Sequence, residues 1–334
     1  MTISFLKHEL KKSLWPTILL TIIGCLIYIP TLARSNFNII NEYHNVVPSP
    51  QIGIIVIFLC IICTIVPVYE YTFLMKKRSV DQYYSLPIKR SSIIAIKFVC
   101  GYFKIFISYT ITFFLGLIVI SLKENSYFLN YYFSFYFYTI LLAFILYSFF
   151  FSRANTIVDG IIFINLYIFI FSLVLINIKD FFRDVLNVII FRITTLEVPY
   201  SPLINITEYY DTLIRYGSSG GQYEHWRSYL LWSIIGVLSF IGLIYVTKFD
   251  KAENAEQVSD SYFGYRIMIP LYLISILYSV KPFSNRINIV SSAVFFCAGL
   301  VGYVIYRRTF KLQVKYWLIL IGSFIFSLLI STIF

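Results

Sequence analysis

The chain has 334 residues and a formal net charge of +11, and 59% of its residues are hydrophobic, 20% aromatic and only 13% charged. A soluble domain carries roughly a quarter charged residues, so this composition leaves too few polar side chains to cover a surface that faces water. It excludes soluble, collagen-like and disordered classes and predicts an all-α polytopic membrane protein. The net positive charge could indicate binding to nucleic acid, but its distribution along the chain favours membrane topology.

Apolar segments of membrane-spanning length recur along the whole chain. A helix needs roughly 20 residues to cross a hydrocarbon core of about 30 Å. By this measure we expect about nine transmembrane helices, of which the segment at 263–280 has the weakest signal. The expected spans are 14–33, 52–75, 93–121, 130–151, 157–178, 228–247, 263–280, 287–306 and 316–334.

The basic residues predict the orientation of these spans. Cytoplasmic loops are enriched in Lys and Arg, and most of the 27 basic residues fall in alternate loops that begin with the N-terminus. The N-terminus is therefore predicted to be cytosolic. The basic residues on this side are Lys7, Lys11, Lys12, Lys76, Lys77, Arg78, Lys89, Arg90, Lys97, Arg153, Lys248, Lys251, Arg266, Arg307, Arg308, Lys311 and Lys315.

The residues that usually carry chemistry are scarce. The chain has three histidines far apart in sequence, no GxxxxGK[ST] phosphate loop and no GxSxG nucleophile motif. Cys60 and Cys63 form a CxxC pair, but it lies within an apolar span and no second pair or His cluster accompanies it. His8-Glu9 begins an HExxH pattern that fails at Lys12. We therefore expect no catalytic residue, no metal site and no cofactor bound by this chain.

An ionisable side chain inside a span has a high free-energy cost, so such a residue is first considered as a candidate for function. Here they lie near the predicted cytoplasmic ends of the spans: Glu70, Lys97, Lys104, Arg153 and Asp159. In one interpretation the lysines, which share one face of a span, extend toward the interface, and Glu70 and Asp159 pair locally with them or with Arg153. In the other, these residues form inner-gate charges that rearrange during transport.

Two asparagines lie within the predicted span 157–178. Asn165 and Asn177 could lie in a substrate path or make hydrogen bonds between helices.

The long external segment 179–227 begins with an amphipathic pattern at 180–193, which predicts a separate helix in the outer interface.

The loop 76–92 is the most informative stretch. Pro87 disfavours helix at Leu86, so we expect a short helix, a bend and then the next span. An ordinary loop that only sets topology would need the basic residues but not the Asp-Tyr-Tyr-Leu-Pro core. That core and the basic residue before it comprise Arg78, Asp81, Tyr83, Tyr84, Leu86 and Pro87.

At this loop the sequence resembles permease subunits of type-2 ATP-binding-cassette (ABC) exporters, particularly those of low-GC Gram-positive bacteria. Three other stretches are similar to the same family: FLKHELKK (Phe5–Lys12), VPYSPLINI (Val198–Ile206) and FDKAENAEQV (Phe249–Val258). The last stretch departs from the family pattern at one position, where Glu256 stands in place of the expected Gly.

The resemblance implies an organisation and a function. Residues 1–260 would form a six-helix exporter core, with a coupling loop at 76–92 and the external segment 179–227, and residues 261–334 would add three spans. Arg78, Asp81, Tyr83, Tyr84, Leu86 and Pro87 would dock on cytosolic ABC ATPase subunits, which would bind ATP and magnesium and perform the hydrolysis.

The resemblance further implies a cell-membrane permease that pairs with a second copy or a paralogue, together with accessory subunits. The distribution of its basic residues already argued against binding to nucleic acid. It would export an amphipathic or lipid-like compound such as a peptide, an antibiotic or a lipid. The alternatives are an ATP-independent membrane transporter and a membrane sensor or assembly component of the cell envelope.

Overall fold

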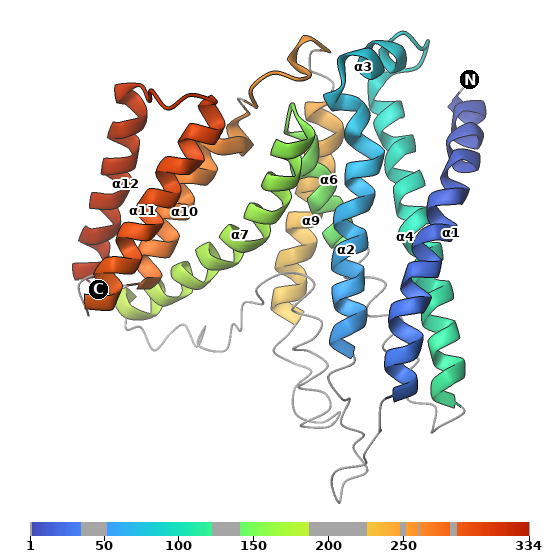
Figure 1. Ribbon diagram of the computed structural model, residues 1–334, viewed down its shortest axis with the longest axis horizontal. Coiled ribbons are helices and arrows are strands. Elements are labelled where there is room, and N and C mark those ends of the chain that lie inside the picture. Colours follow the sequence, from blue (N-terminus) through green and yellow to red (C-terminus); the bar gives the residue numbers. More distant parts are fainter. Residues whose placement is uncertain are drawn as a thin grey trace, which may run out of the picture. The chain divides into compact units, whose positions relative to one another are not determined.

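The computed structural model of the chain describes residues 2–34, 52–121, 141–186, 226–247, 252–259, 261–280 and 286–333. Within these ranges the regular elements are all helices and no strand occurs (Figure 1). Three stretches are long and apolar enough to cross a membrane, namely Thr2–Pro30, Arg90–Gly116 and Val290–Arg307. The prediction of an all-α chain is therefore confirmed for the described residues, and its apolar helices are compatible with a multi-pass membrane protein.

Every segment predicted to span the membrane overlaps a helix, although only residues from 141 onward are described in the segment 130–151. The number of crossings and their orientation stay predictions. The helices concerned are α1 (Thr2–Arg34), α2 (Ile52–Tyr71), α4 (Arg90–Ser121), α6 (Phe144–Ser152), α7 (Ile157–Leu186), α9 (Trp226–Val246), α10 (Ile267–Val280), α11 (Arg286–Arg307) and α12 (Val314–Ile333).

The contacts divide the chain into two compact units. Unit 1 comprises Met1–Ser152 and Ser201–Ala255, and unit 2 comprises Arg153–Tyr200 and Glu256–Phe334. By this division α7 groups with the C-terminal helices α10, α11 and α12 rather than with the helices that precede it. The boundary expected after residue 260 came from the resemblance to a family, and it stays a prediction.

Glycines allow the helices of unit 1 to approach closely. The α1 helix packs along α4, and α2 packs against both α4 and α6. A Cβ atom at Gly24 of α1 would lie 2.3 Å from Phe58 of α2, and one at Gly101 of α4 would lie 2.6 Å from Phe144 of α6. Small residues at such crossings are typical of helices that associate in a membrane.

In unit 2, hydrogen bonds hold α7 against the segment that leads into and through α10. The Tyr167 hydroxyl donates to the Phe263 carbonyl at 2.7 Å, the Asn177 amide donates to the Ser275 carbonyl at 2.6 Å, and the Ser279 hydroxyl donates to Asn177 at 2.8 Å. Asn177 therefore makes hydrogen bonds between helices, as one of the two interpretations expected. Asn165 donates to the Ile161 carbonyl of its own helix.

The end of α7 differs from the sequence-based expectation. A separate helix was predicted to begin at Asp180, but α7 continues without a break from Ile157 to Leu186. The amphipathic pattern of 180–186 thus extends an existing helix. Residues 187–225, which include most of the rest of the external segment, lie outside the described ranges.

The backbone at Glu256 has a conformation that favours glycine, the residue that the family resemblance leads us to expect at this position. Glu256 has φ 66°, in the left-handed region that costs a residue with a Cβ atom roughly 1–2 kcal/mol. Glycine avoids this cost but loses roughly 0.5–1 kcal/mol to the greater freedom of the unfolded chain. Glu256→Gly should therefore raise the free energy of unfolding by about 0.5–1 kcal/mol.

The measurement is thermal unfolding of the purified chain in detergent. Glu253→Gly is the matched control, because Glu253 is an exposed residue of the 3₁₀ turn η4 (Ala252–Asn254) and has no positive φ. That variant should lower the unfolding temperature. Equal losses in both variants would contradict the explanation based on backbone strain.

Candidate functional site

The predicted coupling loop folds as a helix, a turn and a second helix. A 3₁₀ turn, η1 (Thr72–Met75), follows α2, and the extended Lys76 leads into α3 (Lys77–Tyr84). The chain then turns around Pro87, where the Ile88 amide donates to the Leu86 carbonyl at 2.7 Å, and α4 begins at Arg90. The expected short helix and bend are confirmed. Figure 1 shows α3 at the same end of unit 1 as the N-terminus.

The two faces of α3 differ in polarity and burial. Arg78, Asp81 and Gln82 are exposed on one face, whereas Val80 is buried on the other. Tyr83 is half-buried on the inner face and packs against Phe73 with 4.5 Å between the ring centroids. This short helix thus presents polar groups outward and attaches to unit 1 through its apolar and aromatic face.

The six residues predicted to dock a partner are therefore not equivalent in the structure. Arg78, Asp81 and Pro87 are exposed, while Leu86 is half-buried. Tyr84 is half-buried and lies under the Arg90 guanidinium, 4.2 Å from the ring centroid to the guanidinium carbon. Their role in docking stays a prediction, and the orientation of Tyr83 indicates an additional contact within unit 1.

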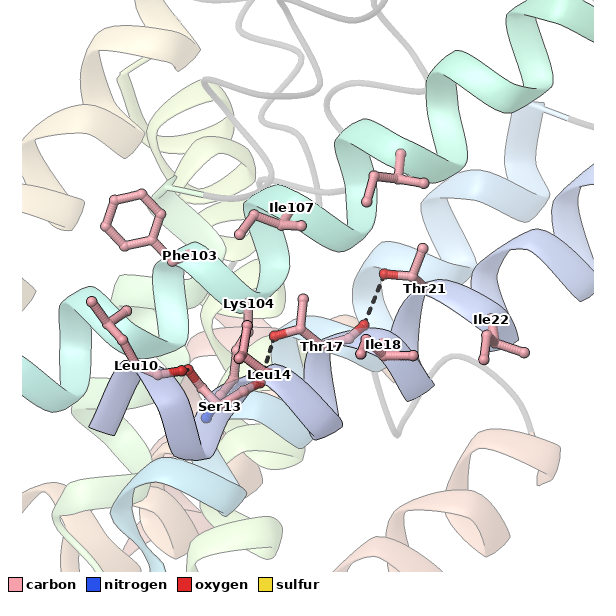
Figure 2. Close-up of a pocket in the computed structure, with 11 residues that line it drawn as sticks. Leu10, Ser13, Leu14, Thr17, Ile18, Thr21, Ile22, Phe103, Lys104 and Ile107 are labelled. Carbon is pink, nitrogen blue, oxygen red and sulfur yellow. Dashed lines mark hydrogen bonds between the residues drawn. The ribbon is translucent and has the colours of Figure 1, made fainter. Parts of the chain in front are cut away.

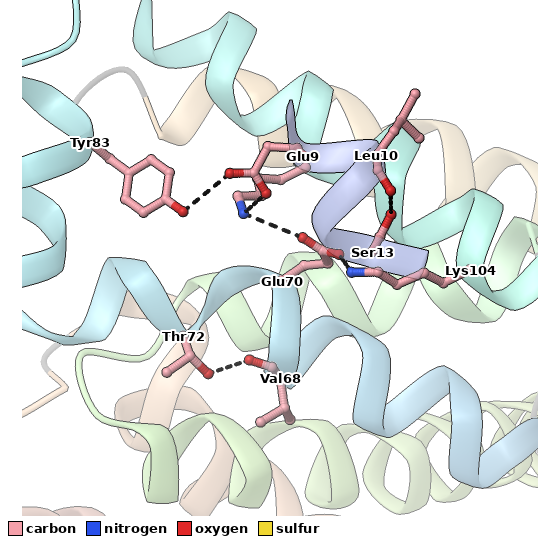
Figure 3. Close-up of polar contacts among 9 residues, drawn as sticks. Glu9, Leu10, Ser13, Val68, Glu70, Thr72, Tyr83 and Lys104 are labelled. Carbon is pink, nitrogen blue, oxygen red and sulfur yellow. Dashed lines mark hydrogen bonds and ion pairs between the residues drawn. The ribbon is translucent and has the colours of Figure 1, made fainter. Parts of the chain in front are cut away.

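Tyr83 connects α3 to the first helix. Its hydroxyl donates to Glu9 Oε1 at 3.3 Å, and Glu9 Oε2 accepts from Lys97 Nζ at 2.5 Å (Figure 3). Burial raises the pKa of the Tyr83 phenol above its ordinary value, so the hydroxyl keeps its proton and remains a donor. Three helices, α3, α1 and α4, are joined by this chain of contacts.

A buried charge cluster, defined here as Glu9, Glu70, Lys97 and Lys104, continues this chain of contacts. Glu70 of α2 makes an ion pair with Lys104, and its other oxygen lies 3.7 Å from Lys97 Nζ (Figure 3). None of the four side chains is more than 6% exposed. Two carboxylates and two ammonium groups balance one another, which buried charges require. The local pairing expected for Glu70 with the two lysines is confirmed.

Glu9 is the member of the buried charge cluster that sequence analysis missed. The sequence placed it in a failed HExxH pattern and in the FLKHELKK stretch, and neither gave it a role in a charge cluster. One sequence feature could have identified Glu9: it is the only acidic residue of α1 and lies among Lys7, Lys11 and Lys12. It is also the one buried side chain between Thr2 and Lys12, which a count of charges could not show.

The other two predicted inner-gate charges, Arg153 and Asp159, belong to unit 2. Both are buried. Asp159 lies in the first turn of α7 and accepts hydrogen bonds from the Ser259 hydroxyl at 2.7 Å and the Tyr265 hydroxyl at 2.8 Å. The five predicted charges are thus distributed over both units, with Glu70, Lys97 and Lys104 together in unit 1.

Asn155 strengthens the polar site around Asp159. Its backbone amide donates to Ser259 Oγ at 2.9 Å, and its side-chain amide donates to the Val258 carbonyl at 2.9 Å. The Glu256 amide in turn donates to the Asn155 carbonyl at 2.9 Å. These contacts join the residues before α7 to the end of the FDKAENAEQV stretch. In the described parts of the chain, no group of three or more His, Cys, Asp or Glu side chains is arranged to hold a metal ion.

No protein-family model, no curated protein and no solved structure matches the chain. Its function must therefore be inferred from its own contacts and from the resemblance of its short motifs.

Proposed function

We propose that the chain is the permease subunit of an ATP-driven ABC exporter, set in the cell membrane with a cytosolic N-terminus and about nine spans. The observation that carries this proposal is that the two faces of α3 have different surroundings. Its outer face exposes Arg78 and Asp81, while Tyr83 on its inner face is bonded to the buried charge cluster. A coupling helix needs both a surface for a partner and a connection to the spanning helices.

Two further observations support the proposal. The η4 turn, which lies in the FDKAENAEQV stretch, contacts α3, so two of the motifs that resemble the exporter family are neighbours in unit 1. Glu256, the one residue that departs from the family pattern, has the backbone conformation that glycine adopts most readily. The departure therefore concerns a side chain and leaves the expected backbone path in place.

The buried charge cluster offers a means of transmitting movement. Lys97 lies between two carboxylates, 2.5 Å from Glu9 and 3.7 Å from Glu70. A shift of α3 or α1 would change which carboxylate Lys97 contacts more closely, while the cluster as a whole would keep its charge balance. Coupling between sites needs an element with alternative arrangements that both sites bias. Closure of the ATPase subunits would supply that bias through α3.

In this proposal the hydrolysis belongs to other subunits. Two cytosolic ATPase subunits would bind ATP and magnesium, and a second permease copy or a paralogue would complete the pathway. The cargo would be an amphipathic or lipid-like compound, which an aromatic and poorly charged interior suits.

The experiment that tests the proposal is co-purification from native membranes. Asp81→Arg combined with Tyr84→Ala should abolish recovery of an ATPase with the chain, while membrane insertion stays at the level of the unmodified protein. The reason is that Asp81→Arg reverses the charge at position 81 of the outer face, and Tyr84→Ala removes an adjacent aromatic ring. Lys311→Glu, a charge reversal at an exposed site of unit 2, is the matched control and should retain the ATPase.

Tyr83→Phe separates docking from coupling. It removes the hydrogen bond to Glu9 and leaves the outer face of α3 unchanged, so the ATPase should still co-purify while its stimulation by cargo falls. An unchanged ATPase yield with the Asp81–Tyr84 double variant would overturn the docking assignment. Native membranes that yield no ATPase with the unmodified chain would favour the ATP-independent transporter or the envelope sensor.

A further inference from the structure

A groove of about 480 Å³ lies between α1 and α4 in unit 1 (Figure 2). Its volume is in the range of about 300–1,000 Å³ that is usual for ligand sites. Aliphatic and aromatic side chains from both helices form most of its walls. They include Leu14, Ile18 and Ile22 of α1 and Phe103, Ile107 and Ile111 of α4.

The few polar residues that line the groove have their hydrogen bonds satisfied elsewhere. The hydroxyls of Ser13, Thr17 and Thr21 donate to carbonyls of α1 itself, at 2.8, 2.7 and 2.8 Å. Lys104 lines the wall, but its ammonium group makes an ion pair with Glu70. The groove therefore offers an apolar surface and no polar group that needs a partner.

The groove is open along one side. In a membrane this side would face hydrocarbon, so an occupant has to be apolar along its length. Ile18, Ile22 and Ile107 are 48%, 53% and 40% exposed, and they lie in stretches long and apolar enough to cross a membrane. From Leu10 to Ile22 the groove follows α1 for about 18 Å, at about 1.5 Å per residue. One leaflet of a bilayer has a hydrocarbon depth of about 15 Å.

Positive charge lies at the N-terminal end of the groove. Lys7 and Lys11 occur three residues before the lining residues Leu10 and Leu14, and this spacing places them on the same face of α1. Both lysines are exposed, and within the described ranges no ion pair uses them. The only carboxylate of α1, Glu9, is buried and engaged by Lys97. The charge at this end is therefore available to an anion.

An exposed aromatic residue accompanies the lysines. Trp15 is 80% exposed and follows Lys11 by one helical turn. Tryptophan is enriched at the boundary between hydrocarbon and headgroups, and juxtamembrane lysines attract anionic lipids. Lys7 and Lys11 thus flank the N-terminal end of the groove and Trp15 lies one turn further along α1, while the lining of the groove continues past Trp15 to Ile22.

We propose that this groove binds one acyl chain of an anionic phospholipid, with Lys7 and Lys11 contacting its phosphate. Lysines at one end of the groove, a boundary tryptophan near that end and an apolar lining that continues beyond it match the phosphate, the interfacial region and the acyl chain of such a lipid. The proposal needs only that unit 1 is embedded in a membrane, and it does not depend on ABC transport. Because α1 also carries Glu9, the bound lipid would hold α1 against α4 next to the buried charge cluster.

The test is native mass spectrometry of the full chain in detergent, offered equal amounts of phosphatidylglycerol and phosphatidylcholine. The unmodified chain should retain one phosphatidylglycerol in preference. Lys7→Gln combined with Lys11→Gln should reduce that preference about 25-fold, at about a factor of five per lysine. Lys311→Gln combined with Lys315→Gln makes the same change of charge at exposed sites elsewhere and should leave the preference unchanged.

A second pair of variants tests the groove itself. Ile107→Trp should fill it and abolish retention of the lipid, whereas Ile241→Trp, at a 56% exposed position of α9, should not. Inorganic phosphate should not displace the lipid. Equal retention of both lipids by the unmodified chain, displacement by phosphate alone, or retention unaffected by Ile107→Trp would each overturn the proposal. Loss of a dimer in Ile107→Trp without loss of lipid would also overturn it and assign the groove to a second copy of the chain.

Discussion

Replacement of Glu70 by alanine should lower the free energy of unfolding by about 3–5 kcal/mol, the usual cost of removing one partner from a buried ion pair. Glu70 is 1% exposed and faces the ammonium groups of both Lys104 and Lys97. Without it, Glu9 alone would have to balance two buried cations. The measurement is thermal or chemical unfolding of the purified chain in detergent.

A double variant distinguishes loss of charge balance from loss of packing. Glu70→Leu combined with Lys104→Met removes one charge of each sign and leaves the pair of Lys97 with Glu9, which are 2.5 Å apart. Apolar replacement of a whole buried pair is often neutral or stabilising, so this variant should unfold near the temperature of the unmodified chain. Lys104→Met alone should destabilise. If the double variant is as unstable as Glu70→Ala, charge balance is not what Glu70 contributes.

Replacement of Asp159 by alanine should lower the free energy of unfolding of unit 2 by about 3 kcal/mol or more. Each hydrogen bond to a charged group is worth about 1.5–3 kcal/mol, and Asp159 accepts one from Ser259 and one from Tyr265. The variant would leave both hydroxyls without this acceptor in a buried site. Hydrogen exchange of α7 and α10 amides is the appropriate measurement, because it reports on unit 2 separately.

The neighbouring tyrosines supply the control for Asp159. Tyr265→Phe removes only the hydroxyl that donates to Asp159, so it should cause part of the loss of stability of unit 2. Tyr262→Phe should cause no loss of stability, because Tyr262 is 72% exposed. Unchanged exchange rates in both Asp159→Ala and Tyr265→Phe would show that this polar site does not stabilise unit 2.

The helices and their approximate limits could be predicted because hydropathy and breaking residues act locally. A run of apolar residues favours helix in a membrane whatever its neighbours are. For the same reason Pro87 predicted the bend between α3 and α4. The pairing of Lys97 and Lys104 with Glu70 was also accessible, since seven residues separate the two lysines and place them on one helical face.

Tertiary packing determines which residues from distant parts of the chain join each cluster. Glu9 is separated from Lys97 by 88 residues, and nothing in the periodicity of α1 distinguishes it from an exposed glutamate. The inward orientation of Tyr83 depends on the packing of α3 against Phe73 and Glu9. The membership of α7 in unit 2 depends on its hydrogen bonds to residues about 100 positions later.

The sequence by itself determined that this protein is helical, apolar and of a kind suited to a membrane, with its scarce polar residues concentrated at a few places. Composition and local periodicity determine these properties, because each residue contributes to them independently of distant ones. Only the tertiary structure decided which charges neutralise one another, which face of α3 is exposed and which surface of α1 remains open. These depend on how helices remote in sequence pack, and a buried charge is stable only where that packing supplies its counter-charge.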